Sequence, residues 1–177
     1  MDDVFRKIRE TTPLVHCITN YVAMNISANV LLAAGASPAM IHAPEETADF
    51  AKIASALTVN IGTLSPPWVE GMKKAITAAS NANVPWVFDP VGHFATPYRA
   101  AVAQDILKMG PTILRGNASE IMSLAGQSSE AKGVDSRDPV EDAEAAALSL
   151  ATAHKSVVVI TGKTDFVTDG KRIARVR

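Results

Sequence analysis

Short apolar runs, rich in β-branched residues, recur along this chain, and a segment of helical character follows most of them. Parallel strands need a long crossover connection, usually a helix, whereas antiparallel strands can be joined by a tight turn. Strands of parallel sheets are apolar along their length because helices cover both faces. The pattern therefore predicts an α/β fold, with a mostly parallel sheet and helices on both faces. The predicted strands are residues 14–19, 56–61, 86–88, 112–114 and 157–161.

Cap signals locate the starts of several helices. Ser65 precedes two prolines, which is the preferred order at a helix start, and apolar residues then recur at helical spacing from Trp68 to Ala79. Asn117 with Glu120 three residues later has the form of a capping box. Further helices are predicted at residues 2–10, 22–34, 44–54, 96–109, 118–125 and 139–153, and a surface loop at residues 127–138.

The C-terminal end of the sequence has the pattern of a β-hairpin. The pair Asp169-Gly170 lies between two β-rich runs, which is a strong signal for a tight turn. Arg177 follows the second run directly, so the predicted sheet ends on a hairpin edge that no helix covers. We therefore expect one α/β domain over residues 1–177 that lacks its C-terminal part.

Charge and cysteine content exclude several classes of protein. The 177 residues include 17 Lys and Arg against 18 Asp and Glu, a net charge of -1, so no basic field attracts nucleic acid or an anionic membrane. The single cysteine, Cys17, excludes an internal disulfide and a cysteine-rich metal site. A reducing, cytoplasmic location is the expectation.

An uncharged stretch near the N-terminus suggests a binding pocket. No Asp, Glu, Lys or Arg occurs between Glu10 and Glu45, yet asparagines interrupt the stretch, which is therefore too polar for a transmembrane helix. Asn25 and Asn29, four residues apart on a predicted helix, face the same way. They are either solvent-exposed polar groups or, together with Asn20 after the preceding strand, part of a pocket for an uncharged ligand.

Polar side chains next to glycines follow four predicted strands. In open α/β sheets ligands bind at the carboxyl ends of the strands, so we expect these groups to converge. The four segments are Gly62-Thr63, Asp89 with Gly92, Arg115-Gly116-Asn117 and Thr161-Gly162.

The charged members of this set fit phosphoryl transfer. Mg²⁺ is held by one or two carboxylates together with substrate phosphates, which is a role open to Asp89 and Glu120. Arg115 and Thr161 can bind phosphate oxygens. Each residue also has a purely structural alternative: a turn for Asp89, the capping box for Glu120, a surface ion pair for Arg115 and a strand-end turn for Thr161. Met40 either fills a gap in the core or packs on a ligand ring.

Two common alternatives lack their motifs. The sequence contains no GxxxxGK[ST] loop, so it does not encode a P-loop kinase. The four histidines do not have the spacing of zinc ligands, and no zinc site is predicted.

Taken in order, six motifs resemble those of the hydroxyethylthiazole kinase family. They are residues 18–20 with Asn25, 35–40, 60–64, 89–92, 115–120, and 159–162 with the turn at 169–170, and they span nearly the whole chain. The resemblance implies a ribokinase-like fold and transfer of the ATP γ-phosphate to the hydroxyethyl group of 4-methyl-5-(2-hydroxyethyl)thiazole, a step of thiamine biosynthesis and salvage. It also implies Mg²⁺ and a homotrimer with sites at subunit interfaces.

The resemblance assigns a role to each matching residue. It also implies that family members continue past Arg177 with the anion hole and the catalytic base, so no catalytic residue is predicted within this chain. The alternatives are a non-catalytic ligand-binding or oligomer-assembly module, and a related sugar or pyrimidine-alcohol kinase. The assigned residues are Asn20, Asn25, Met40 and Gly62 for the thiazole, Arg115, Thr161 and Asn117 for ATP, and Asp89 and Glu120 for Mg²⁺.

Overall fold

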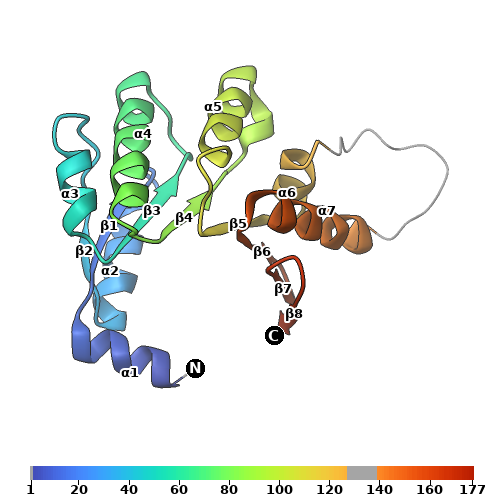
Figure 1. The fold of residues 1–177 in the computed structure, drawn as a ribbon, viewed down its shortest axis with the longest axis horizontal. Helices are drawn as coiled ribbons and strands as arrows, with labels where there is room; N and C mark the ends of the chain where they lie inside the picture. The colour runs from blue at the N-terminus through green and yellow to red at the C-terminus, as the bar shows by residue number, and fades with distance from the viewer. Residues whose placement is uncertain (1, 127–138) are drawn as a thin grey trace. The chain divides into compact units, whose positions relative to one another are not determined.

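The computed structural model describes residues 2–126 and 139–177, which form two compact units, Met1–Trp86 and Val87–Arg177 (Figure 1). Each unit is an α/β arrangement with parallel strands. The loop predicted at residues 127–138 lies outside the described residues. The expectation of one domain stays a prediction.

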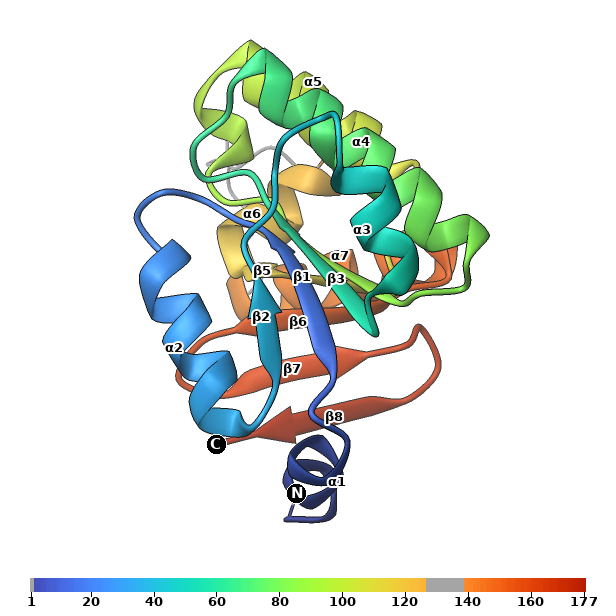
Figure 2. The ribbon, with the colours of Figure 1, turned by 90° about the vertical axis from the view of Figure 1, so that its left-hand side faces the viewer.

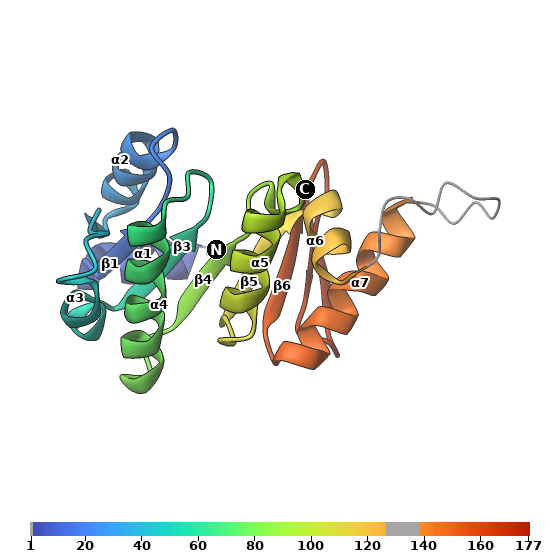
Figure 3. The same ribbon diagram turned by 90° about the horizontal axis from the view of Figure 1, so that it is seen from above.

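Three parallel strands form the sheet of the first unit, in the order β2-β1-β3. Figures 2 and 3 show helix α2 on one side of these strands and helices α3 and α4 on the other. Helices therefore cover both faces here, as the sequence predicts. The elements are α1 (Asp2–Thr11), β1 (Leu14–Ile18), α2 (Met24–Ala34), β2 (Ser37–Ala39), α3 (Thr47–Ile53), β3 (Ala56–Asn60) and α4 (Pro66–Asn81).

The two longest helices of this unit differ in burial. In α4 the apolar stripe that begins at Trp68 is buried, and the Ser65 hydroxyl accepts a hydrogen bond from the Trp68 N–H at 3.4 Å, as expected for its cap. In α2 no residue is buried, although the helix is uncharged and largely apolar. It ends at Gly35, whose φ of 99° lies in the left-handed region that glycine tolerates. The apolar side of α2 is thus left exposed within this unit.

The second unit combines parallel strands with a C-terminal hairpin. Strands β4, β5 and β6 are parallel, and β7 and β8 are antiparallel around the predicted Asp169-Gly170 turn. Figure 1 shows α5, α6 and α7 on one side of these strands. The elements are β4 (Trp86–Asp89), the 3₁₀ helix η1 (His93–Ala95), α5 (Pro97–Leu107), β5 (Ile113–Asn117), α6 (Ala118–Leu124), α7 (Pro139–His154), β6 (Val157–Thr161), β7 (Asp165–Thr168) and β8 (Ile173–Val176).

Strand β5 is longer than the sequence predicts. The prediction ended this strand at Leu114 because a polar Arg-Gly-Asn segment follows, yet the structure continues it to Asn117. Pairing with β6 explains the difference, since Gly116 lies opposite Ile160 and Asn117 opposite Thr161. Cross-strand pairing satisfies the backbone groups of a segment whose side chains do not favour a strand.

Candidate active site

Three charged or hydroxyl side chains lie at or near the carboxyl ends of β4, β5 and β6, and two of them are in contact. Asp89 is the last residue of β4, and its Oδ2 lies 3.0 Å from Nη1 of Arg115 on β5. Thr161 ends β6, directly opposite Asn117, and its hydroxyl donates to the Gly116 carbonyl at 3.4 Å. Asp89 and Arg115 are thus in contact, and Thr161 lies at the end of the neighbouring strand. The roles of all three residues stay predictions.

The ion pair of Asp89 and Arg115 is only partly shielded from solvent. The Asp89 side chain is 16% exposed and that of Arg115 is 50% exposed. A half-exposed pair of this kind contributes about 1 kcal/mol or less to stability. The contact orients two groups of opposite charge and leaves the guanidinium accessible to a further anion.

Glu120 and Asn117 form the predicted capping box at the start of α6. The Asn117 Oδ1 accepts from the Glu120 N–H at 2.9 Å, and the Glu120 Oε2 accepts from the Asn117 N–H at 2.8 Å. The other oxygen of the buried Glu120 carboxylate, Oε1, accepts from the Gly92 N–H at 3.0 Å. The carboxylate therefore links α6 to the loop that follows β4, which a capping box alone does not require.

The donor set at these strand ends fits Mg²⁺ held jointly with phosphate. A carboxylate offers about four lone-pair sites, of which the two N–H groups use two at Glu120. Mg²⁺ commonly takes one or two carboxylates and completes its octahedron with water and substrate phosphates. Within residues 2–126 and 139–177, no three His, Cys, Asp or Glu residues are grouped as metal ligands. Asp89 and Glu120 thus suit a site that needs the phosphates of a substrate.

A cavity of about 500 Å³ lies in the second unit, beside Thr161. Ile160 and Phe166 form part of its apolar lining. The guanidinium of Arg175 lies 5.3 Å from the centre of the Phe166 ring and pairs with Glu144 of α7 at 2.7 Å. The volume is in the range of small-molecule sites. Further lining residues are Ala118, Ala143, Gly162, Lys163, Thr164 and Arg177.

Of this cavity's lining, sequence reasoning assigned a site role only to Thr161, with Gly162 beside it. The residues that it missed come together through the β7–β8 hairpin, which carries Arg175 to α7, 31 positions away in the chain. The Asp169-Gly170 turn was the available signal for the hairpin, but no sequence pattern identifies the helix against which it packs.

The strand ends of the first unit carry neutral groups. Asn20 follows β1, Met40 follows β2 and Gly62 follows β3, so the order β2-β1-β3 places all three at one edge of the sheet. Buried Asn20 accepts from the Ala23 N–H at 2.9 Å and donates to Oδ1 of Asn60 at 2.8 Å. Asn60 was not predicted as a site residue, since its place at a strand end was its only signal.

Glycine is required at position 62 because the backbone there passes very close to the side chain of Asn20. A Cβ built at position 62 would lie 2.6 Å from Nδ2 of Asn20, which is too close for a non-bonded contact. The N–H of Gly62 also donates to Oδ1 of Asn60 at 2.9 Å. Gly62 therefore allows Asn20 and Asn60 to pack at this edge.

Asn25 and Asn29 lie on one side of α2, as predicted. Nδ2 of Asn29 donates to the carbonyl oxygen of Asn25 at 2.9 Å and to its Oδ1 at 3.2 Å. Both side chains are exposed, and Met40 is half-buried. The contact of Asn25 and Met40 with a thiazole stays a prediction.

Two buried titratable groups lie within β1, His16 and Cys17. Burial lowers the pKa of His16, against the opposing effects of its hydrogen bond to the Ile41 carbonyl and of nearby Glu46. Burial also raises the pKa of the Cys17 thiol to about 11, so this cysteine is inert as a nucleophile near neutral pH.

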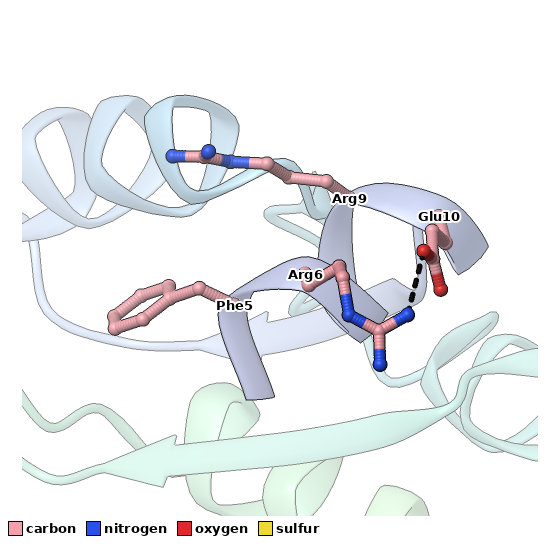
Figure 4. Close-up of a pocket in the computed structure, with 4 residues that line it drawn as sticks. All are labelled: Phe5, Arg6, Arg9 and Glu10. Atoms are coloured by element: carbon pink, nitrogen blue, oxygen red, sulfur yellow. Dashed lines mark hydrogen bonds and ion pairs between the residues drawn. The ribbon is translucent and has the colours of Figure 1, made fainter. Parts of the chain in front are cut away.

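A second cavity, of about 550 Å³, lies on α1 in the first unit (Figure 4). Its lining residues are Phe5, Arg6, Arg9 and Glu10, all exposed, and Nη1 of Arg6 pairs with Glu10 at 2.9 Å. It contains none of the predicted site residues, and its lining includes no buried polar group. It is therefore a surface groove and not a preformed binding site.

The described parts of the chain contain no helix that is both long and apolar enough to cross a bilayer.

Comparisons with known proteins agree with the motifs. Residues 5–177 match the model of the hydroxyethylthiazole kinase family. The hydroxyethylthiazole kinase of Rhizobium etli strain CFN 42 is 62% identical over 170 residues, which are 96% of this chain and 66% of that protein. The corresponding protein of Gemmatimonas aurantiaca is 59% identical over 174 residues, 98% of this chain and 63% of that protein. The chain thus spans slightly less than two thirds of the length of these relatives.

Solved structures give the same result. The hydroxyethylthiazole kinase protein from Pyrococcus horikoshii OT3 has a TM-score of 0.87 at 40% identity, covering 98% of this chain and 65% of that chain. The pyridoxal kinase from Staphylococcus aureus has a TM-score of 0.69 at 17% identity, covering 93% of this chain and 71% of that chain, a likeness of fold alone. The predicted ribokinase-like α/β fold is confirmed, and the chain belongs to the hydroxyethylthiazole kinase family.

Proposed function

We propose that this chain phosphorylates the hydroxyethyl group of 4-methyl-5-(2-hydroxyethyl)thiazole with ATP and Mg²⁺, a step of thiamine biosynthesis and salvage. The observation that carries the proposal is the contact of Asp89 with Arg115, with Thr161 at the end of the next strand and Glu120 bonded to the loop after β4. The names of the relatives supply the substrate class.

In this proposal the second unit binds the nucleotide and the metal. Asp89 and Glu120 hold Mg²⁺, which neutralises charge on the phosphates when it is bound. Arg115, with its guanidinium half exposed, and Thr161 bind phosphate oxygens, and Asn117 orients the nucleotide at the start of α6. The cavity beside Thr161 provides an apolar wall and basic groups for the remainder of ATP.

The first unit binds the uncharged alcohol. Asn20, Asn25, Met40 and Gly62 supply amides, a thioether and a close backbone approach, and none of them carries a charge that a neutral ring would have to desolvate. A thioether beside an aromatic ring contributes about 0.3–1.5 kcal/mol.

We further propose a homotrimer that uses the exposed apolar side of α2. Ile26, Val30 and Leu32 of this helix are exposed, as are Tyr21 and Val22 just before it, and such patches mark interaction sites. Sedimentation equilibrium tests the trimer, and Val30→Glu should shift the chain towards monomer. The low cysteine content favours a reducing compartment, and we place the reaction in the cytoplasm.

The test of the function is ATP-dependent phosphorylation of the thiazole alcohol by this chain, followed by detection of the phosphate ester. A panel with a sugar and a pyrimidine alcohol checks the substrate class, and a preference for either contradicts the thiazole assignment. Calorimetric binding of thiazole without turnover would instead support the non-catalytic module.

A further inference from the structure

Arg99 occupies a place where a cation is unfavourable for its own helix. It lies in the first turn of α5, and its N–H donates to the hydroxyl of Thr96, the cap residue, at 3.2 Å. The N-terminus of a helix carries a partial positive charge, so a guanidinium there weakens the helix electrostatically. The reason for an arginine at this position must therefore lie in the contacts of its side chain.

The guanidinium points back to the loop after β4. Nε of Arg99 donates to the Gly92 carbonyl at 3.0 Å, and Nη2 donates to the Val91 carbonyl. Gly92 has a φ of 55°, in the left-handed region, and a Cβ at this position would come no closer than 3.9 Å to Nη2 of Arg99. Gly92 is thus required by backbone conformation rather than by space, and Arg99 holds the carbonyl groups on both sides of it.

The same peptide group is held from its other end by Glu120. The Val91 carbonyl and the Gly92 N–H belong to one planar peptide, in which they point in opposite directions. Arg99 binds the carbonyl, and the N–H donates to Oε1 of Glu120 at 3.0 Å. A cation on the oxygen polarises the peptide and strengthens the hydrogen bond that its N–H makes. One peptide therefore connects the guanidinium to the buried carboxylate.

Both charges also lie near buried His93. Burial lowers the pKa of His93, its hydrogen bond to the Pro90 carbonyl and the charge of Glu120 oppose this, and Arg99 adds to it. A neutral imidazole adds no charge beside the Glu120 carboxylate.

We propose that Arg99 is a positioning residue: it orients the Val91–Gly92 peptide, which in turn holds the Glu120 carboxylate in place relative to Asp89. The inference rests on the proposed function, because that function assigns Asp89 and Glu120 to Mg²⁺. Arg99 itself touches neither substrate nor metal. It acts through one peptide bond, in the manner of the outer partners that fix metal ligands.

The test compares Arg99→Ala and Arg99→Lys with the control Lys108→Ala, an exposed cation after the other end of α5. The first readout is hydrogen exchange of the Gly92 amide by NMR, without ligand. The second is calorimetric titration with Mg²⁺ at saturating ADP. We expect faster Gly92 exchange in Arg99→Ala and an affinity for Mg²⁺ lowered about 10-fold. Arg99→Lys should lie between, because an ammonium cannot reproduce the guanidinium fork. Thiazole binding should be unchanged.

The hold of Arg99 on the Val91–Gly92 peptide is called the clamp here. If the Gly92 amide exchanges at the wild-type rate in both Arg99 variants, the clamp is overturned. Faster exchange with unchanged Mg²⁺ affinity would overturn the positioning role, leaving only a structural one. If the wild type itself does not bind Mg²⁺ with ADP, the proposed function and the metal role of Arg99 both fall, whereas the Gly92 exchange still decides whether the clamp exists. Arg99→Lys supplies the same readouts if Arg99→Ala does not fold.

Discussion

The two units place different chemistry at the same topological position. The carboxyl ends of β1, β2 and β3 carry amides, a thioether and a glycine, whereas those of β4, β5 and β6 carry a carboxylate, a guanidinium and a hydroxyl. Parallel strands bring their carboxyl ends together whatever the side chains are. The sheet therefore decides where these groups lie, and the few residues after each strand decide which chemistry they offer.

The two sets of strand ends also differ in the bonds that hold their side chains in place. We call the carboxyl ends of β1, β2 and β3 the neutral edge and those of β4, β5 and β6 the charged edge. At the neutral edge Asn20 bonds to Asn60 and to the Ala23 N–H, and no charge takes part. At the charged edge Asp89 and Arg115 form an ion pair that solvent reaches. Salt screens exposed charges but hardly affects neutral hydrogen bonds. Binding of the alcohol should thus be insensitive to ionic strength, and binding of the nucleotide should weaken as salt rises.

The largest effect is expected for Asp89→Asn, which removes a charge from the proposed metal site while keeping the shape of the side chain. The turnover number should fall about 1,000-fold, because the metal loses a ligand and the phosphates lose neutralisation. Calorimetric affinity for the thiazole alcohol should stay the same. The control is Asp49→Asn, whose exposed carboxylate pairs with Lys52 on the same helix and which should turn over normally. An equal loss of thiazole affinity would break the division between the two edges.

Arg115→Ala is expected to lower kcat/KM for ATP about 100-fold. The variant loses the half-exposed guanidinium that remains accessible beside Asp89. Arg115→Lys should recover part of the activity, since a point charge remains but not the bidentate fork. Steady-state kinetics at low and high salt provide the measurement. Wild-type values of kcat/KM in Arg115→Ala would contradict its role in binding phosphate.

Gly62→Ala tests the neutral edge. The new Cβ would lie 2.6 Å from Nδ2 of Asn20, so the amide must move and its bond to Asn60 is disturbed. We expect KM for the alcohol to rise about 10-fold and the free energy of unfolding to fall by about 1–3 kcal/mol. KM for ATP should not change.

Gly110→Ala is the control for this substitution. A Cβ there meets nothing within 4 Å, and the φ of 75° makes the cost one of backbone strain alone. It should lower stability by roughly 1 kcal/mol without changing either KM. If the two glycine variants raise KM for the alcohol equally, the Asn20 edge is not the acceptor site.

Local signals in the sequence were sufficient to predict much of the fold and part of the candidate site. Ser65 before its prolines and Asn117 with Glu120 are interactions within one helical turn, so the chain displays them directly. The polar residues after apolar strands were sufficient to predict that Asp89 and Arg115 lie together with Thr161 on the next strand, because parallel strands end on the same side of the sheet.

The contacts that the sequence did not reveal join residues far apart in the chain. Glu120 meets the Gly92 N–H across 28 positions, and Asn20 meets Asn60 across 40. Nor could the chain alone show that Arg115 lies within β5, because pairing with β6 extends that strand against local preference. Such contacts depend on tertiary packing, which no local pattern specifies.

The smallest expected effect is one that the two units share. His16 in the first unit and His93 in the second are both buried, and burial lowers the pKa of each below the ordinary value of 6.5. Below pH 6.5 an unfolded histidine therefore takes up a proton that the folded one does not. The free energy of unfolding should fall as the pH drops through 6.5 towards the folded pKa, and it should be flat above.

Urea unfolding between about pH 7.5 and 5.5 measures this slope, since carboxylates titrate mainly below that window. His16→Asn and His93→Asn should each lower stability at pH 7.5 but flatten the decline towards pH 5.5, because each removes one group that charges only on unfolding. If only one variant flattens the decline, the two units differ in stability against acid as well as in the chemistry of their strand ends. A decline as steep in both variants as in the wild type would assign the acid sensitivity to other groups.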